Sequence, residues 1–115
     1  IVWSDGTPFT LADVLFTSDC GMGQAGCYRE AKFESVSKVA ALYDLTVKSS
    51  FTNPMPKTYG PCVGSHTPIL QNAKFENCTG TRRQECTEEN FGPIGTGPFV
   101  VTEFNIKLCI MHKIL

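Results

Sequence analysis

Six cysteines in a chain of 115 residues are the feature that most limits what this sequence can fold into. A reducing cytosol uses so many cysteines for metal binding or for chemistry, whereas an oxidising compartment uses them to cross-link small domains. Cys20 and Cys27 flank a glycine-rich segment, and Cys78 and Cys86 flank a polar one. Each interval suits a short loop closed by a disulfide, which would stabilise the fold by about 2.5 kcal/mol by restricting the unfolded chain.

A zinc site is the alternative use of the cysteines. Zinc ligands usually come in tight pairs such as C-x2-C, and neither interval has that spacing. The two remaining cysteines, Cys62 and Cys109, each stand shortly before a histidine, at His66 and His112. Isolated pairs of this kind are frequent by chance. We therefore favour local disulfides, and we expect neither a metal nor a cofactor.

The rest of the composition is that of an ordinary globular chain, with 42% hydrophobic and 18% charged residues and a formal net charge of −1. Such a charge offers no basic surface for nucleic acid or for an anionic membrane. No apolar run approaches the roughly 20 residues of a membrane-spanning helix. The chain opens on Ile1 without an initiator methionine, so we expect a mature segment or an internal piece of a longer protein.

The first residues predict a surface turn that leads into a capped helix. Residues 4–8 are dense in turn formers, because Asp binds nearby amides, Gly accepts positive φ and Pro fixes φ. Thr10 and Asp13 have the spacing of a capping box. We expect a short helix over residues 11–18, with three apolar residues on one face. These are Leu11, Val14 and Leu15.

The later segments mix strands and loops. The periodicity of residues 28–42 fits a helix as well as a strand, whereas residues 45–51 alternate in the way of a strand with one buried face. Tyr43-Asp44 is then the turn of a hairpin. Residues 71–92 are polar and predicted to be irregular, and residues 97–104 predict a turn entering a strand. The buried positions expected in the strand over residues 45–51 are Leu45, Val47 and Phe51.

No catalytic arrangement is recognisable. The glycine-rich stretch 92–98 does not suit a phosphate loop, because Pro93 and Pro98 remove amide donors and no Lys-Ser/Thr follows. Ser65 and His66 are adjacent, and adjacent side chains of an extended segment point in opposite directions. We therefore expect no enzymatic activity.

Three stretches, taken in order, resemble a known family. Residues 3–10, followed by Asp13, Val14 and Phe16, resemble the signature W-S-D-G-x-P-[FL]-T-A-x-D-V-x-F of the large solute-binding proteins that deliver peptides, nickel or other small solutes to ABC importers. Residues 36–51 resemble the paired strands of these proteins, and residues 95–99 resemble their G-T-G-P-[FY] turn. The likeness spans about residues 2–104.

This resemblance implies a fold and a function. The chain would be an α+β fragment, with an antiparallel hairpin and one short capped helix, from lobe I of a two-lobed, periplasmic-binding-protein-like (type II) α/β fold. Residues 1–105 would form part of lobe I, and residues 106–115 an atypical C-terminal tail that exposes apolar surface. The segment before Tyr43 becomes a strand. The complete protein would be a monomer in the periplasm or outside the cell, and would pass a small solute, such as a peptide, to ABC permease subunits.

The resemblance also names site residues. The family's corresponding loop lies towards the cleft, so the expected solute-binding residues are Val63, Gly64, Ser65 and His66. Similar loops are bridged in a branch of the family, which implies disulfides between Cys20 and Cys27 and between Cys78 and Cys86. The alternative function, which assumes that the chain is complete, is a small secreted interaction module stabilised by disulfides.

Overall fold

The computed structural model of the chain describes residues 1–24, 31–63, 68–80, 82 and 94–113. Its elements are, in chain order, helix α1 (Leu11–Gly21), the 3-10 turn η1 (Ala31–Phe33), strands β1 (Val36–Tyr43) and β2 (Thr46–Phe51), helix α2 (Asn72–Phe75), and strands β3 (Phe99–Asn105) and β4 (Leu108–Lys113). β1 pairs with β2 and β3 with β4, both antiparallel. The described part is thus an α+β structure with two separate hairpins.

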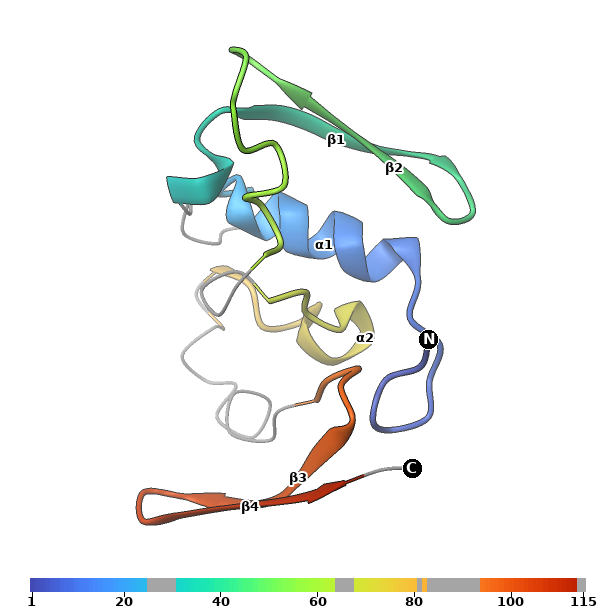
Figure 1. Ribbon diagram of the computed structural model, residues 1–115, viewed down its shortest axis with the longest axis vertical. Coiled ribbons are helices and arrows are strands. Elements are labelled where there is room, and N and C mark those ends of the chain that lie inside the picture. The colour runs from blue at the N-terminus through green and yellow to red at the C-terminus, as the bar shows by residue number, and fades with distance from the viewer. Residues whose placement is uncertain (25–30, 64–67, 81, 83–93, 114–115) are drawn as a thin grey trace.

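The elements are stacked around α1 (Figure 1). Hairpin β1–β2 lies on one side of α1 and α2 on the other, and hairpin β3–β4 lies beyond α2. The Cα radius of gyration is 15.1 Å, against about 13 Å expected of a compact domain of this length. Among the described residues, no helix is both long and apolar enough to cross a membrane.

Helix α1 starts where the sequence predicts and ends three residues later. Thr10 and Asp13 form the capping box, as expected. The helix continues past Ser18 to Gly21, and the following turn contains Gly23 with a φ of 81°. Left-handed backbone of this kind favours glycine and ends helices.

The buried face of α1 is polar and small, and it is not the apolar face seen in the sequence. Its buried residues are Asp13, Thr17, Ser18 and Gly21. Asp13, Thr17 and Gly21 are spaced four residues apart and therefore lie on one side of the helix. The predicted apolar face, Leu11, Val14 and Leu15, is only half-buried. Apolar periodicity does not identify the buried face of this helix, because polar side chains are buried there together with their hydrogen-bond partners.

The hairpin β1–β2 confirms the paired strands implied by the resemblance. β1 begins at Val36, and the turn lies at residues 44–45, one position later than predicted. Leu45 is therefore in the turn and 88% exposed, so its expected burial in the strand is wrong. Val47 and Phe51 are in β2 and half-buried.

Two further elements complete the described part. The expectation of irregular structure over residues 71–92 is wrong at its start, where α2 forms a single helical turn; residues 81 and 83–92 lie outside the described residues. The predicted strand after Gly97 is β3. The described part of the predicted tail, residues 106–113, supplies the turn of the second hairpin and then β4. The division at residue 105 stays a prediction.

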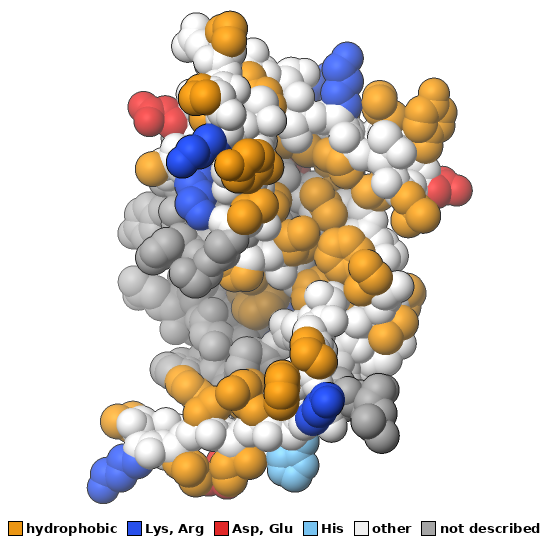
Figure 2. All heavy atoms as spheres, in the orientation of Figure 1, with side chains coloured by type: hydrophobic (Ala, Val, Ile, Leu, Met, Phe, Trp, Pro, Cys, Tyr) orange, Lys and Arg blue, Asp and Glu red, His pale blue; other side chains and the backbone are white. Residues whose placement is uncertain are grey.

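The core is small. Phe33, only 1% exposed, packs so closely on Gly21 that a Cβ atom at Gly21 would lie 2.5 Å from the ring. This contact docks η1 on the end of α1. Many large hydrophobic side chains remain at the surface of both hairpins, where Figure 2 shows them on the visible face. They include Leu42, Tyr43, Phe99, Phe104 and Met111.

Candidate functional site

The predicted solute-binding segment is described at its first residue only. Val63 is 51% exposed, and its backbone oxygen accepts a 2.6 Å hydrogen bond from Lys32 Nζ. Gly64, Ser65 and His66 lie outside the described residues. The structure therefore places one member of the predicted set at the surface, beside η1.

The residue before Val63 has an unusual backbone. Cys62 has a φ of 63°, in the left-handed region that non-glycine residues seldom adopt. Its side chain is half-buried against α1 as a free thiol. Burial raises the pKa of the Cys62 thiol above the ordinary value of 9.0, and a hydrogen bond with the Ser18 hydroxyl opposes this rise.

The buried carboxylate of Asp13 is the centre of the polar core. Oδ2 accepts hydrogen bonds from the indole Nε1 of Trp3 at 3.0 Å and from the backbone amide of Thr10 at 2.9 Å. Oδ1 accepts from the backbone amide of Asn72 at 2.8 Å. Asp13 is 4% exposed. One side chain of α1 therefore holds the N-terminal turn, its own helix start and the start of α2.

A second carboxylate fixes the N-terminal turn on the residue before α2. Asp5 Oδ1 accepts from the backbone amide and the hydroxyl of Thr7, at 2.9 and 2.6 Å. Asp5 Oδ2 accepts from Gln71 Nε2 at 2.9 Å, and the same nitrogen donates to Thr7 Oγ1 at 2.7 Å. The hydrogen bond from Gln71, with those from Thr7, lowers the pKa of Asp5 below its ordinary value of 3.8.

Two further contacts join segments that are distant in the sequence. The Thr17 hydroxyl donates to the carbonyl of Asp13 and accepts from the amide of Leu70, both at 2.8 Å. The amide of Ser4 donates to the carbonyl of Gly95 at 2.8 Å, and the amide of Gly95 donates to Ser4 Oγ at 3.4 Å. The turn beginning near residue 95 is therefore attached directly to the family signature at residues 3–10.

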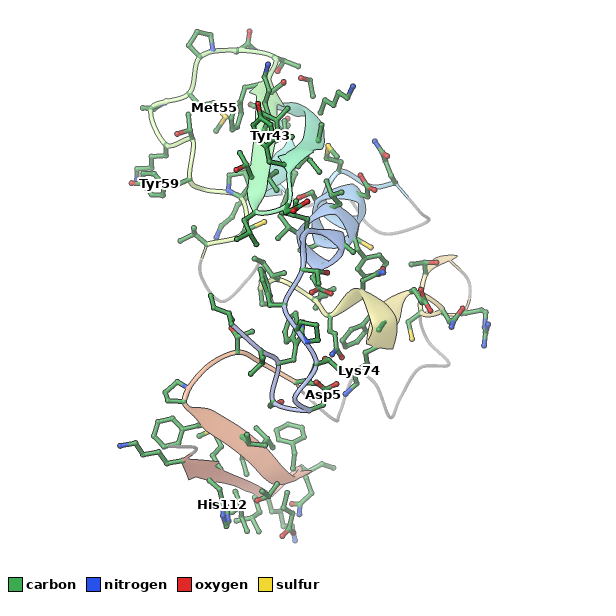
Figure 3. All side chains as sticks on the ribbon, turned by 90° about the vertical axis from the view of Figure 1, so that its right-hand side faces the viewer. Asp5, Tyr43, Met55, Tyr59, Lys74 and His112 are labelled. Atoms are coloured by element: carbon green, nitrogen blue, oxygen red, sulfur yellow. The ribbon has the colours of Figure 1, made fainter. Side chains whose placement is uncertain are left out.

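These contacts give the signature an architectural role. Among the described residues, every buried side-chain nitrogen and oxygen has a hydrogen-bond partner, and no three His, Cys, Asp or Glu side chains gather as metal ligands. Figure 3 shows Asp5 beside α2, at a distance from Tyr43, Met55 and Tyr59 at one end of the molecule and from His112 at the other. The side chains of this cluster, which are Asp5, Asp13, Thr17 and Gln71, thus bind other segments of the same chain.

The cysteines divide into two kinds. Cys20 and Cys78 are disulfide-bonded, whereas Cys62 and Cys109 are free thiols. Cys27 and Cys86, the predicted partners of Cys20 and Cys78, lie outside the described residues. The pairing therefore stays a prediction.

The sequence of this chain and this arrangement match a known family. Residues 1–108 match the sequence model of the bacterial extracellular solute-binding proteins, family 5 Middle, so the chain belongs to that family. Proteins of Brucella melitensis and Brucella abortus that are named as candidate binding proteins are each 27% identical to it over 112 residues, which is 96% of this chain and 17% of theirs.

Solved structures show the same fold. The periplasmic oligopeptide-binding protein of an oligopeptide ABC transporter from Thermotoga maritima matches 98% of this chain with a TM-score of 0.74 and 25% identity. NikZ from Campylobacter jejuni, in complex with Ni(L-His), matches 92% with a TM-score of 0.71 and 24% identity. The chain spans about one fifth of the length of each. The resemblance inferred from the sequence, to type II periplasmic binding proteins of ABC importers, is thus confirmed.

Sequence reasoning missed two parts of this arrangement. The signature implied a turn and a capped helix, but not that Asp13 also binds Trp3 and the start of α2, because those partners come from the tertiary fold. Lys32 was not singled out either. One exposed lysine carries no pattern, and only its contact with Val63 distinguishes it.

Proposed function

We propose that the protein to which this chain belongs is the substrate-binding component of an ABC transporter and captures peptides or a similar small solute for import. The observation that carries this proposal is the match of 98% of the chain to an oligopeptide-binding protein at a TM-score of 0.74, together with family membership over residues 1–108. Residues 1–105 contribute part of lobe I. No observation favours the alternative, a self-contained interaction module.

Capture needs no covalent chemistry. In the proposed mechanism, two lobes close on a solute as rigid bodies, and the affinity comes from desolvated contacts made by both lobes in the closed state. The solute shifts the population towards this state only by its preference for it. The protein is then not an enzyme, and this chain alone binds solute weakly or not at all.

Val63, Gly64, Ser65 and His66 are the proposed solute-contacting residues of this chain. The exposed side chain of Val63 supports the proposal, because an apolar group held at a surface can be buried by a ligand. Gly64 has no side chain and would let a solute approach the backbone.

The proposed location is the periplasm or the outside of the cell, with the permease subunits of the transporter as membrane partners and a monomeric complete protein. The disulfide bonding of Cys20 and Cys78 supports an oxidising location. We assign their partners as Cys27 and Cys86, each closing a short local loop.

Calorimetric titration of the complete protein tests the capture proposal. Separate pools of peptides, of divalent metals with and without histidine, and of oligosaccharides are titrated into ligand-free protein. Saturable binding of the peptide pool is expected. Binding of only the metal pool or only the sugar pool would indicate that the solute is a metal complex or an oligosaccharide instead of a peptide. Absence of binding to every pool would contradict the capture proposal.

A further inference from the structure

The contact between Lys32 and Val63 suggests a role for a residue outside the predicted site. Lys32 lies in the middle of η1, and its ammonium group reaches across to the backbone oxygen of Val63 at 2.6 Å. Hydrogen bonds from a charged donor are stronger than those between neutral groups. The two residues are far apart in the sequence, so this bond fixes one segment of the fold against another.

The backbone of Lys32 is attached to helix α1 through its neighbour Phe33. Phe33 follows it directly, is 1% exposed and packs on Gly21 without room for a methyl group. Gly21 belongs to the buried face of α1, which Asp13 connects to the N-terminal turn and to α2. The Lys32 backbone is therefore anchored, through the neighbouring Phe33, to the buried face of α1.

The segment that Lys32 holds is also fixed from its other side. Cys62 adopts a left-handed backbone and inserts its thiol beside the Ser18 hydroxyl of α1. The amide of Val63 donates to the carbonyl of Gly60 at 3.4 Å. The backbone at residues 62–63 is thus held by α1 and by η1, whereas the Val63 side chain stays half exposed.

We propose that Lys32 is a positioning residue, which holds the backbone of Val63 so that its side chain is presented to the solute in a fixed place. This inference rests on the proposed function. A contact group that is ordered before binding loses less entropy when the ligand arrives, so pre-ordering raises affinity without a contact of its own. Lys32 itself does not touch the solute.

The test compares Lys32→Met, which keeps length but removes the donor, with Lys32→Arg, which keeps a charged donor. Lys38→Met is the matched control, because Lys38 is an exposed lysine of the adjacent strand β1. The complete protein is titrated with an equimolar tripeptide library. In parallel, the rate of Cys62 alkylation by iodoacetamide is measured by mass spectrometry without any solute, as a direct report on order beside Val63.

Lys32→Met is expected to weaken library binding and to speed Cys62 alkylation, each about three- to ten-fold, the size of one net hydrogen bond. Lys32→Arg should restore most of both, and Lys38→Met should change neither. Faster alkylation with unchanged affinity would overturn the proposal, since Lys32 would then order a segment that the solute does not use. Unchanged alkylation would overturn it as well. A wild-type protein that binds no peptide would instead mark the failure of the proposed function.

Discussion

Replacing Asp13 tests whether the signature is held together as described. Asp13→Ala removes the acceptor of four donors, which are the indole of Trp3, the amide and the hydroxyl of Thr10, and the amide of Asn72. A buried donor left unsatisfied costs about 1–3 kcal/mol, and partial access of water to the two amides offsets some of this. We expect a loss of about 3–5 kcal/mol. Asp13→Asn keeps one oxygen and the side-chain volume, so we expect about 1–3 kcal/mol.

The assay is urea unfolding of the 115-residue chain, followed by the fluorescence of Trp3, its single tryptophan. Asp19→Ala is the matched control. It removes a carboxylate from the same helix near its C-terminal end, where negative charge is unfavourable, so its effect should be within about 0.5 kcal/mol. The reasoning is refuted if Asp13→Ala changes the free energy of unfolding no more than Asp19→Ala does.

Three other results are expected. Gly21→Ala should destabilise the chain by about 1–3 kcal/mol in the same assay, because the added methyl group overpacks against Phe33 despite the better helix propensity of alanine. Gly97→Ala should be nearly neutral, because the space around a Cβ atom at Gly97 is open. Equal effects of the two substitutions would contradict the packing argument. The pKa of Asp5 is depressed in the folded state, so its stabilising contribution is present above pH 3.8 and is lost as pH falls through the lower folded value; Asp5→Asn should therefore flatten the acid limb of a stability–pH curve, and an unchanged limb would contradict this. Exposed Cys109 should react with iodoacetamide faster than Cys62, whose burial raises its pKa; the reverse order in a mass-spectrometric time course would be inconsistent with the described environment.

Local chemistry carried much of the fold prediction. The turn at residues 4–8, the capping box of Thr10 and Asp13, and the strands β2 and β3 follow from residue types and short spacings, which is the range over which backbone preferences act. The order of three motifs along the chain predicted the family. Both kinds of information are contained in the sequence itself.

What escaped prediction depends on contacts between distant segments. The buried side of α1 could not be derived from apolar periodicity, because Asp13 and Thr17 are buried only where Trp3, Leu70 and Asn72 supply their partners. The predicted solute segment followed from the resemblance alone, and the structure describes only Val63 of it.

Small-angle X-ray scattering of the complete protein, with and without the tripeptide library, tests the central claim that this chain is part of a solute-capturing clamp. Two lobes that close on a solute predict a saturable decrease in the radius of gyration as the library concentration rises. A radius of gyration that stays constant with peptides, metals and oligosaccharides alike would contradict the account.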